Sequence, residues 1–192
     1  MFGKLIASAL LIVFSVNVAQ AEEAHVAPIM AKLPEIKKSI VNDTAISTIK
    51  AGSASRSEVT EAEVEKLEAQ WKSELDSGNL DLIASVTQNP LADHLRSVVE
   101  ASGGFISEIN VMDANGFSVG QSSPNSDIYQ GEEGKYRKTY LKGPDVAFVD
   151  EVEFDDSTQT DQSQVNFTVV DPASGKAIGA VSVGIDVSDI VD

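Results

Sequence analysis

Apolar positions recur at intervals of three and four residues through the first half of the chain, which is the spacing of amphipathic helices. The pattern predicts a helix over residues 27–50, with Pro34 at a start or kink, and a second that runs to about Asp76. Two capping boxes, Ser55–Glu58 and Thr60–Glu63, fit the start of the second helix. A third helix begins at Asn89-Pro90, a cap followed by a first-turn proline. The predicted buried stripes are Ile29, Leu33, Ile36, Ile40, Val64, Leu67, Trp71, Leu75, Leu91, Leu95, Val98 and Val99.

From Phe105 onward the period changes to two, the spacing of half-buried strands. Five strands are expected, over residues 106–112, 117–120, 146–154, 162–170 and 177–187, with tight turns at residues 113–116 and 171–176. Together these patterns predict an α+β fold in which N-terminal helices pack on one face of a five-stranded antiparallel sheet. The helical region (residues 22–104) and the sheet domain (residues 105–192) are expected to form one folded unit.

The first residues have the pattern of a secretory signal. A basic start ending at Lys4 precedes an apolar run from Leu5 to Val18, and Ala19-Gln20-Ala21 presents small residues at the positions that signal peptidase reads. The apolar run is shorter than the roughly 20 residues needed to span a membrane. We therefore expect a signal peptide over residues 1–21, cleavage after Ala21 and a periplasmic protein.

Composition and charge exclude several functions. Asp and Glu total 30 against 14 Lys and Arg, a formal charge of −16, which disfavours nucleic acid and anionic membrane surfaces as partners. The absence of Cys excludes disulfides and thiolate metal sites. No nucleophile elbow, phosphate loop, dinucleotide fingerprint or zinc motif is present, so we expect no enzymatic activity, no cofactor and no metal.

The acidic stretch 145–161 leaves one alternative open. Clustered carboxylates can bind Ca²⁺, although the spacing here is not that of an EF-hand. A solvated hairpin loop is the simpler interpretation.

Three segments of the sheet region resemble the extracytoplasmic PAS-like sensors known as Cache or PDC domains. Ile109–Gly116 is similar to their opening hairpin, Val169–Val181 to their closing hairpin and Gly184–Val187 to their last strand. The resemblance implies a helix on one sheet face and a small molecule bound on the other face, under a covering loop. Members in receptors continue into a membrane helix. Because this chain ends at Asp192, we expect a stand-alone form.

Strand alternation places polar residues on one sheet face: Gln164, Asn166 and Thr168 on one strand, and Ser182, Gly184 and Asp186 on the next. Asp150 interrupts the apolar face of a third strand. This polar face is either the floor of a ligand site or an ordinary solvated sheet surface.

The segment before the third strand gathers cations and aromatic residues in an otherwise acidic protein. Arg pairs with carboxylates and Tyr provides a flat wall, so the segment suits an organic anion or an amino acid, whose ammonium group would meet Asp150 or Asp186. Alternatively, these cations balance the neighbouring carboxylates of Glu132, Glu133 and Asp145. The candidate ligand-binding residues are Tyr129, Tyr136, Arg137, Lys138, Tyr140, Lys142, Asp150, Asn166, Thr168, Ser182 and Asp186.

Two functions remain open at this stage, with a Ca²⁺-dependent structural domain as a third behind them. The first is a periplasmic domain that binds or senses a small molecule, a carboxylate or amino acid, and presents it to a membrane receptor. The second is a protein-interaction module that dimerises or docks a partner through its N-terminal helices without a small ligand.

Overall fold

The computed structural model describes residues 24–56, 59–78, 80–155, 160–188 and 190. The expected signal peptide therefore lies outside the described residues. The elements are α2 (Val26–Ile40), α3 (Asp43–Ser55), α4 (Glu61–Ser77), α5 (Asp81–Thr87), α6 (Pro90–Ala101), β1 (Ile106–Asp113), β2 (Ser118–Gln121), α7 (Gly134–Arg137), η1 (Tyr140–Lys142), β3 (Ala147–Val149), β4 (Glu153–Asp155), β5 (Thr160–Val170) and β6 (Ala177–Asp186).

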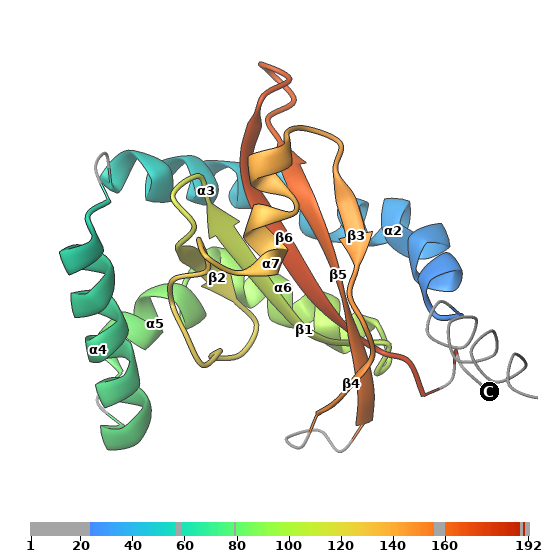
Figure 1. Cartoon of the computed structure of the whole chain (residues 1–192), viewed down its shortest axis with the longest axis horizontal. Coiled ribbons are helices and arrows are strands. Elements are labelled where there is room, and N and C mark those ends of the chain that lie inside the picture. Colours follow the sequence, from blue (N-terminus) through green and yellow to red (C-terminus); the bar gives the residue numbers. More distant parts are fainter. Residues whose placement is uncertain (1–23, 57–58, 79, 156–159, 189, 191–192) are drawn as a thin grey trace, which may run out of the picture.

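The strands form one antiparallel sheet in the order β2-β1-β6-β5-β3, with β4 also paired to β5 (Figure 1). This confirms the α+β class and the antiparallel sheet. The sheet has six strands rather than five, because the expected third strand is divided at Asp150–Val152 into β3 and β4. Both pieces pair with β5, the longest strand.

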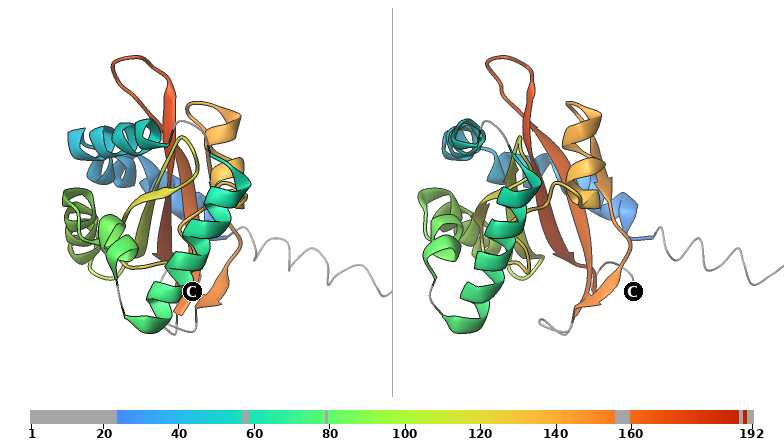
Figure 2. Two further views of the ribbon diagram at one scale, coloured as in Figure 1. Left: turned by 90° about the vertical axis from the view of Figure 1, so that its left-hand side faces the viewer. Right: turned by 60° about the vertical axis from the view of Figure 1, so that its left-hand side comes forward.

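The apolar face of the sheet packs against α2, α3 and α6. Val165 and Phe167 of β5 lie opposite Val183 and Val181 of β6, and these four side chains are buried with Ile29 of α2 in the main core. In Figure 2, α3 and α6 lie on one side of the sheet and α7 lies on the other. The predicted alternation is thus correct for β5 and β6, and the polar face is the one beneath α7.

For β3 the prediction is wrong. Ala147 and Val149 pack on the main core, whereas Phe148 lies opposite Asn166 on the face of α7. Asp150 therefore does not interrupt an apolar face.

The single helix predicted over residues 27–50 is two helices. The chain breaks after Ile40, and the Asn42 side chain caps α3 by accepting a 2.9 Å hydrogen bond from the backbone N–H of Ala45. Pro34 lies inside α2 and does not mark the break. The helical segment also continues past residue 50, its expected end, because Gly52 lies inside α3, where an added Cβ would be 2.5 Å from Cγ1 of Val119. Gly52 therefore allows α3 to approach the sheet closely.

Helix α4 and its neighbours enclose a second apolar cluster at the end of the sheet. Of the two predicted caps, Thr60 is the one that caps α4. Trp71 is buried and donates a 2.9 Å hydrogen bond to the carbonyl of Asn125. Leu75, predicted to be buried, is 42% exposed, while its neighbour Glu74 is only 4% exposed.

The Glu74 carboxylate accepts hydrogen bonds from the backbone N–H groups of Leu82 and Ile83 at 2.8 and 3.0 Å. Helix α5 has no side-chain cap of its own, so this carboxylate from α4 satisfies its first backbone donors. Burial opposes ionisation of Glu74, but the hydrogen bonds from Gln70, Ile83 and Leu82 together lower its pKa.

In the parts of the chain that the structure describes, no helix is both long and apolar enough to cross a lipid bilayer.

Candidate functional site

The segment between β2 and β3 covers the polar face of the sheet. Tyr136 of α7 packs on Met112 and Ala180, and its ring stacks on that of Tyr140 with 5.1 Å between the centroids. The Tyr136 hydroxyl donates a 2.6 Å hydrogen bond to the carbonyl of Ala114. Burial raises the pKa of Tyr136 well above its usual range, so this hydroxyl stays protonated and available as a donor.

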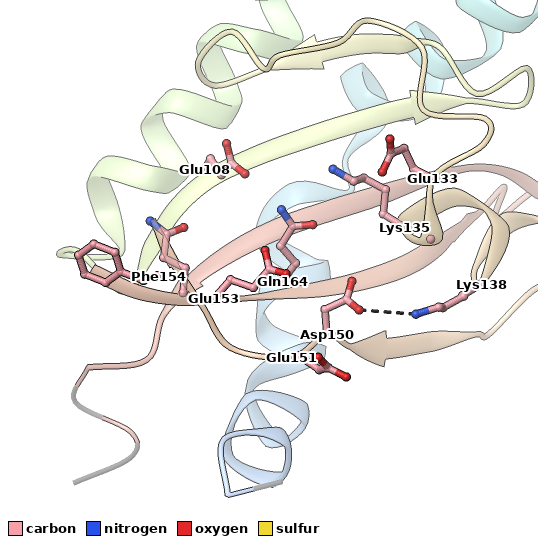
Figure 3. Close-up of a pocket in the computed structure, with 11 residues that line it drawn as sticks. Glu108, Glu133, Lys135, Lys138, Asp150, Glu151, Glu153, Phe154 and Gln164 are labelled. Carbon is pink, nitrogen blue, oxygen red and sulfur yellow. Dashed lines mark ion pairs between the residues drawn. The ribbon is translucent and has the colours of Figure 1, made fainter. Parts of the chain in front are cut away.

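Beside α7 the same face opens into a cleft of about 740 Å³ (Figure 3). We call it the acidic cleft, because carboxylates predominate among its side chains. Its lining comes from β1, from α7 and the residues that flank it, from the segment that joins β3 to β4, from β4 and from β5. The lining residues are Glu108, Glu133, Gly134, Lys135, Lys138, Asp150, Glu151, Glu153, Phe154, Gln162 and Gln164.

Strand register brings the floor of the cleft together. Glu108 of β1 pairs with Gly184 of β6, and Gly184 pairs with Gln164 of β5, so these three residues form one row across the sheet. In the neighbouring row, Gln162 of β5 pairs with Glu153 of β4. Gly184 contributes no side chain, and an added Cβ would lie 2.8 Å from Cγ of Glu108. The glycine thus leaves room for its neighbours to lie over the floor.

Asp150 is the link between the sheet and α7. Its Oδ1 lies 3.6 Å from Nζ of Lys138, which also sits 4.8 Å above the centre of the Phe148 ring (Figure 3). Behind the cleft, the backbone carbonyl of Asp150 accepts hydrogen bonds from Nε2 of the buried His25, at 2.9 Å, and from Ser163, at 2.7 Å. Asp150 is therefore fixed through its backbone while its carboxylate faces the cleft.

A row of uncharged polar side chains continues the floor beneath α7. Gln121 pairs with Asn110, Asn110 with Ser182, and Ser182 with Asn166, so the row crosses β2, β1, β6 and β5. All four residues are at most 4% exposed. Ser182 donates to Oε1 of Gln164, which lines the cleft, and the Asn166 amide lies 3.5 Å from the Asp150 carboxylate. The row thus adjoins the cleft.

Most of these buried side chains have polar atoms without a hydrogen-bond partner among the described residues. The atoms on this face are both amide atoms of Asn110, Nε2 of Gln121, Oδ1 of Asn166, Oγ1 of Thr168 and Oγ of Ser118. An unsatisfied buried donor or acceptor costs about 1–3 kcal/mol. A polar occupant or water that supplied the missing hydrogen bonds would remove this cost.

The structure separates the expected site residues into three groups: those in the cleft or its polar floor, those packed elsewhere, and those exposed outside the cleft. Lys138 and Asp150 line the cleft, and Asn166, Thr168 and Ser182 lie in the buried polar floor. Tyr136 and Tyr140 pack above the sheet, Tyr129 packs on Phe117 in the α4 cluster, and Asp186 lies beside Gln162 without lining the cleft. The third group, Arg137 and Lys142, is exposed and outside the cleft.

Sequence reasoning missed several residues of the site. Glu108 and Asn110 lie on β1 at the alternation that faces α7, so the period-two pattern of residues 106–112 could have identified them. Gln162, Glu133 and Glu153 could not be assigned without the register of β4 and the position of α7. Among the described residues, no three His, Asp or Glu side chains lie close enough together to hold a metal ion.

The comparisons with known proteins concern the fold. No family model matches the sequence, and no curated protein is similar to it. Among solved structures, the sensor domain of the V. cholerae histidine kinase DctB is 14% identical over 85% of this chain and 59% of its own, with a TM-score of 0.38. The ligand-binding domain of the Campylobacter jejuni chemoreceptor Tlp3, in complex with 4-methylisoleucine, is 20% identical over 78% and 62%, with a TM-score of 0.40.

The ligand-binding domain of the Pseudomonas aeruginosa amino acid chemoreceptor PctC, in complex with GABA, is 13% identical over 66% of this chain and 60% of its own, with a TM-score of 0.42. The chain thus spans about three fifths of the length of these structures. They are sensor or ligand-binding domains, and the ligands named for them are properties of those proteins.

Proposed function

We propose that this protein binds a small polar molecule on the sheet face beneath α7 and acts as a ligand-binding or sensing domain. The observation that supports the proposal is the set of unpartnered buried polar atoms next to an open cleft. A volume of about 740 Å³ suits a small ligand, since such sites span roughly 300–1,000 Å³. Binding rather than catalysis is proposed, because the described residues of the cleft lining include neither a hydroxyl nucleophile nor a histidine.

The charges of the cleft favour a ligand with an ammonium group over an organic anion. Arg137 and Lys142, on which the anion hypothesis depended, are exposed and outside the cleft. Lys138 is paired with Asp150, so an incoming carboxylate would compete for it. Of the two ligand classes expected from the sequence, the amino acid is therefore better supported than the organic anion, and a simple amine is equally compatible.

The proposal is tested by thermal unfolding of the protein against a panel of amino acids, amines and carboxylates. A ligand that binds only the folded state stabilises it by about 2.7 kcal/mol at a hundred times its dissociation constant. Asn110→Leu should abolish the ligand-dependent shift and leave the unliganded protein as stable or more stable, because it removes a buried amide with no partner.

Asn42→Leu is the matched control. It removes the cap of α3, far from the cleft, and should cost about 1 kcal/mol of stability while preserving the ligand-dependent shift. A full ligand-dependent shift in Asn110→Leu would exclude the polar row from the site. A panel without any shift would contradict ligand binding and favour the interaction module that uses the N-terminal helices, as a homodimer or with a protein partner.

Periplasmic location and a membrane receptor as partner belong to the same proposal. The pattern of residues 1–21 supports export. A domain that binds a ligand in the periplasm needs a membrane receptor or transporter to transmit the binding event to the cell. Sequencing of the N-terminus of protein recovered from the periplasm should give Glu22 as the first residue. A chain that still begins at Met1 would contradict the cleavage.

A further inference from the structure

Helix α4 holds the covering segment, residues 122–146 between β2 and β3, from outside the sheet. In Figure 1, α4 stands at the left edge of the molecule, apart from β5 and β6. Nε1 of Trp71 donates to the carbonyl of Asn125 at 2.9 Å. Oε1 of Glu68 accepts from the backbone N–H of Tyr129 at 2.7 Å. Because residues three apart share a helix face, one face of α4 binds both ends of residues 125–129.

Glu68 uses only one of its two oxygens in this contact. The other, Oε2, is buried without a hydrogen-bond partner among the described residues. Nζ of Lys72, one turn along α4, is 4.0 Å from Oε2, which is too long for a hydrogen bond, and the Lys72 side chain is 64% exposed. A buried acceptor without a donor destabilises the fold. A proton shared with a neighbouring group would supply what Oε2 lacks.

The neighbouring group is the carboxylate of Asp127, which belongs to the covering segment. Nζ of Lys72 is 3.6 Å from Oδ1 of Asp127, so Glu68 and Asp127 share one exposed ammonium group. The other oxygen of Asp127 accepts a 2.6 Å hydrogen bond from Ser126. Ionised carboxylates are acceptors only, so neither can donate to the other while both are charged. One proton between them would supply a donor and remove their repulsion.

The surroundings of Glu68 favour its protonated form. Burial is the largest cause that raises the pKa of Glu68 above 4.5, and the charge of Asp127 raises it further. The N–H of Tyr129 and the ammonium group of Lys72 act in the opposite direction without cancelling the rise. Among the described residues, Asp127 from the covering segment and Lys72 from α4 are the charged groups that face Glu68. The side chains that α5 and Phe117 contribute to the α4 cluster are apolar.

The direction of the pH effect follows from linkage. A raised carboxyl pKa means that the folded state binds the proton more tightly than the unfolded chain does. The stabilisation is therefore fully present below pH 4.5, the unfolded-state value, and it is lost as the pH rises through the folded-state pKa of Glu68. This is the opposite of the pH dependence expected for a carboxylate held in an ion pair.

We propose that the Glu68–Asp127 pair is a proton-dependent contact, which holds α4 on the covering segment at acid pH and loosens as the pH rises. The contact is strongest when one proton joins the two carboxyl groups and weakest when both are ionised. Because Trp71 packs in a cluster separate from the main core, α4 can loosen while the sheet stays folded. The covering segment then loses its outer attachment and keeps its backbone hydrogen bonds to Gly116 and Ser118. This contact does not depend on occupancy of the acidic cleft.

The test is amide hydrogen exchange on the full chain at several pH values between about 4.5 and 7.5, corrected for the intrinsic pH dependence of exchange. The opening equilibrium of α4 and of residues 125–129 should rise severalfold with pH, because one unit of pKa difference corresponds to about a factor of ten in such an equilibrium. Strands β5 and β6 provide the internal reference and should change little.

Three variants separate this pair from the general acidity of the chain. Glu68→Gln keeps an acceptor for the N–H of Tyr129 and carries a permanent donor for Asp127, so exchange in α4 should be slow at both ends of the pH range. Asp127→Asn removes the repulsion from the other side and should have the same effect. Glu65→Gln removes an equal charge from the exposed surface of α4 and should retain the full pH dependence. Circular dichroism of the variants verifies the fold.

Each remaining outcome has a defined meaning. Exchange in α4 that is independent of pH, or that depends on pH equally in Glu68→Gln, would overturn the inference. Faster exchange in Glu68→Gln at every pH would also overturn it, because it would show that the charge of Glu68 is what holds α4 to Tyr129. Loss of the pH dependence in Glu65→Gln as well would assign the effect to the acidity of the whole helix. Ligand binding beneath α7 is tested separately, so it stands or falls on its own.

Discussion

The hydroxyl of Tyr136 donates a 2.6 Å hydrogen bond to the carbonyl of Ala114, so α7 is tied to the turn between β1 and β2. The opposite side of that turn is tied to the end of α3. Ser53 accepts a hydrogen bond from the N–H of Ala114, and the Asn115 amide donates to the carbonyls of Ser53 and Arg56. One turn therefore contacts both layers that flank the sheet.

Replacing Tyr136 with Phe should lower the free energy of unfolding by about 1 kcal/mol, the net value of one ordinary hydrogen bond. The ring can keep its stacking on Tyr140. Urea denaturation measures the change. Tyr140→Phe serves as the control and should cost less than about 0.5 kcal/mol, because the Tyr140 hydroxyl has no hydrogen bond within the described residues. Equal losses in the two variants would contradict a specific role for the Tyr136 hydroxyl.

Asp171 should make stability depend on pH in the acid range. Its carboxylate accepts from Lys50 at 2.9 Å, from Ser174 and from the N–H of Ala173, and these contacts, Lys50 first, lower its pKa below 3.8. A lowered pKa stabilises the fold above the unfolded-state value, and that stabilisation is lost as the pH falls through the folded-state pKa.

Asp171→Asn should therefore be less stable than the natural protein at pH 7, with the difference disappearing at a pH well below 3.8. Chemical denaturation at several pH values gives the two curves. A difference that stayed constant across this range would show that ionisation of Asp171 does not contribute.

Gly52→Ala should destabilise the protein although alanine favours helices by about 1 kcal/mol over glycine. The added methyl would lie 2.5 Å from Cγ1 of Val119, a stiff side chain packed in the main core. Overpacking of this kind costs about 1–3 kcal/mol, so the net change should be a loss of up to 2 kcal/mol. Ser47→Ala, on the exposed side of the same helix, should be neutral or stabilising in the same denaturation assay.

Trp71→Phe should cost about 2 kcal/mol, since it shrinks a fully buried side chain and removes the hydrogen bond to Asn125. The loss should concentrate in the α4 cluster, which is separate from the main core. Hydrogen exchange should therefore show faster exchange in α4 and α5 with little change in β5 and β6. Uniformly faster exchange would mean that the two clusters unfold together.

The sequence predicted the fold better than the site, and particular residues explain the difference. The alternation of Val165, Phe167 and Val169 with Gln164, Asn166 and Thr168 follows from the pleat alone, so both faces of β5 could be assigned in advance. The break at Asn42 was missed, because apolar spacing continues through it. Leu75 was misplaced because Glu74 caps α5, a contact between two helices that no pattern within α4 reveals.

The covering segment shows why the site itself was harder to predict. In a helical turn, residues three apart share a face while adjacent residues do not. Lys135 and Lys138 of the α7 region accordingly line the cleft, and Arg137 is exposed. The sequence analysis considered Lys135, Arg137 and Lys138 together, because composition alone does not tell which face each side chain takes. The position of Glu108 opposite Glu153 depends on register across four strands, which local patterns do not contain.

Asp150 contacts two parts of the molecule that the sheet separates. Its carboxylate faces the cleft, and its carbonyl accepts the hydrogen bond from His25 at the start of α2. If an occupant shifts the equilibrium of this contact, linkage requires that a change in the contact shift the affinity of the occupant by the same factor. Through Asp150, a change at the first turn of α2 would therefore alter the affinity of the cleft for its ligand, and a bound ligand would alter the contact at that turn.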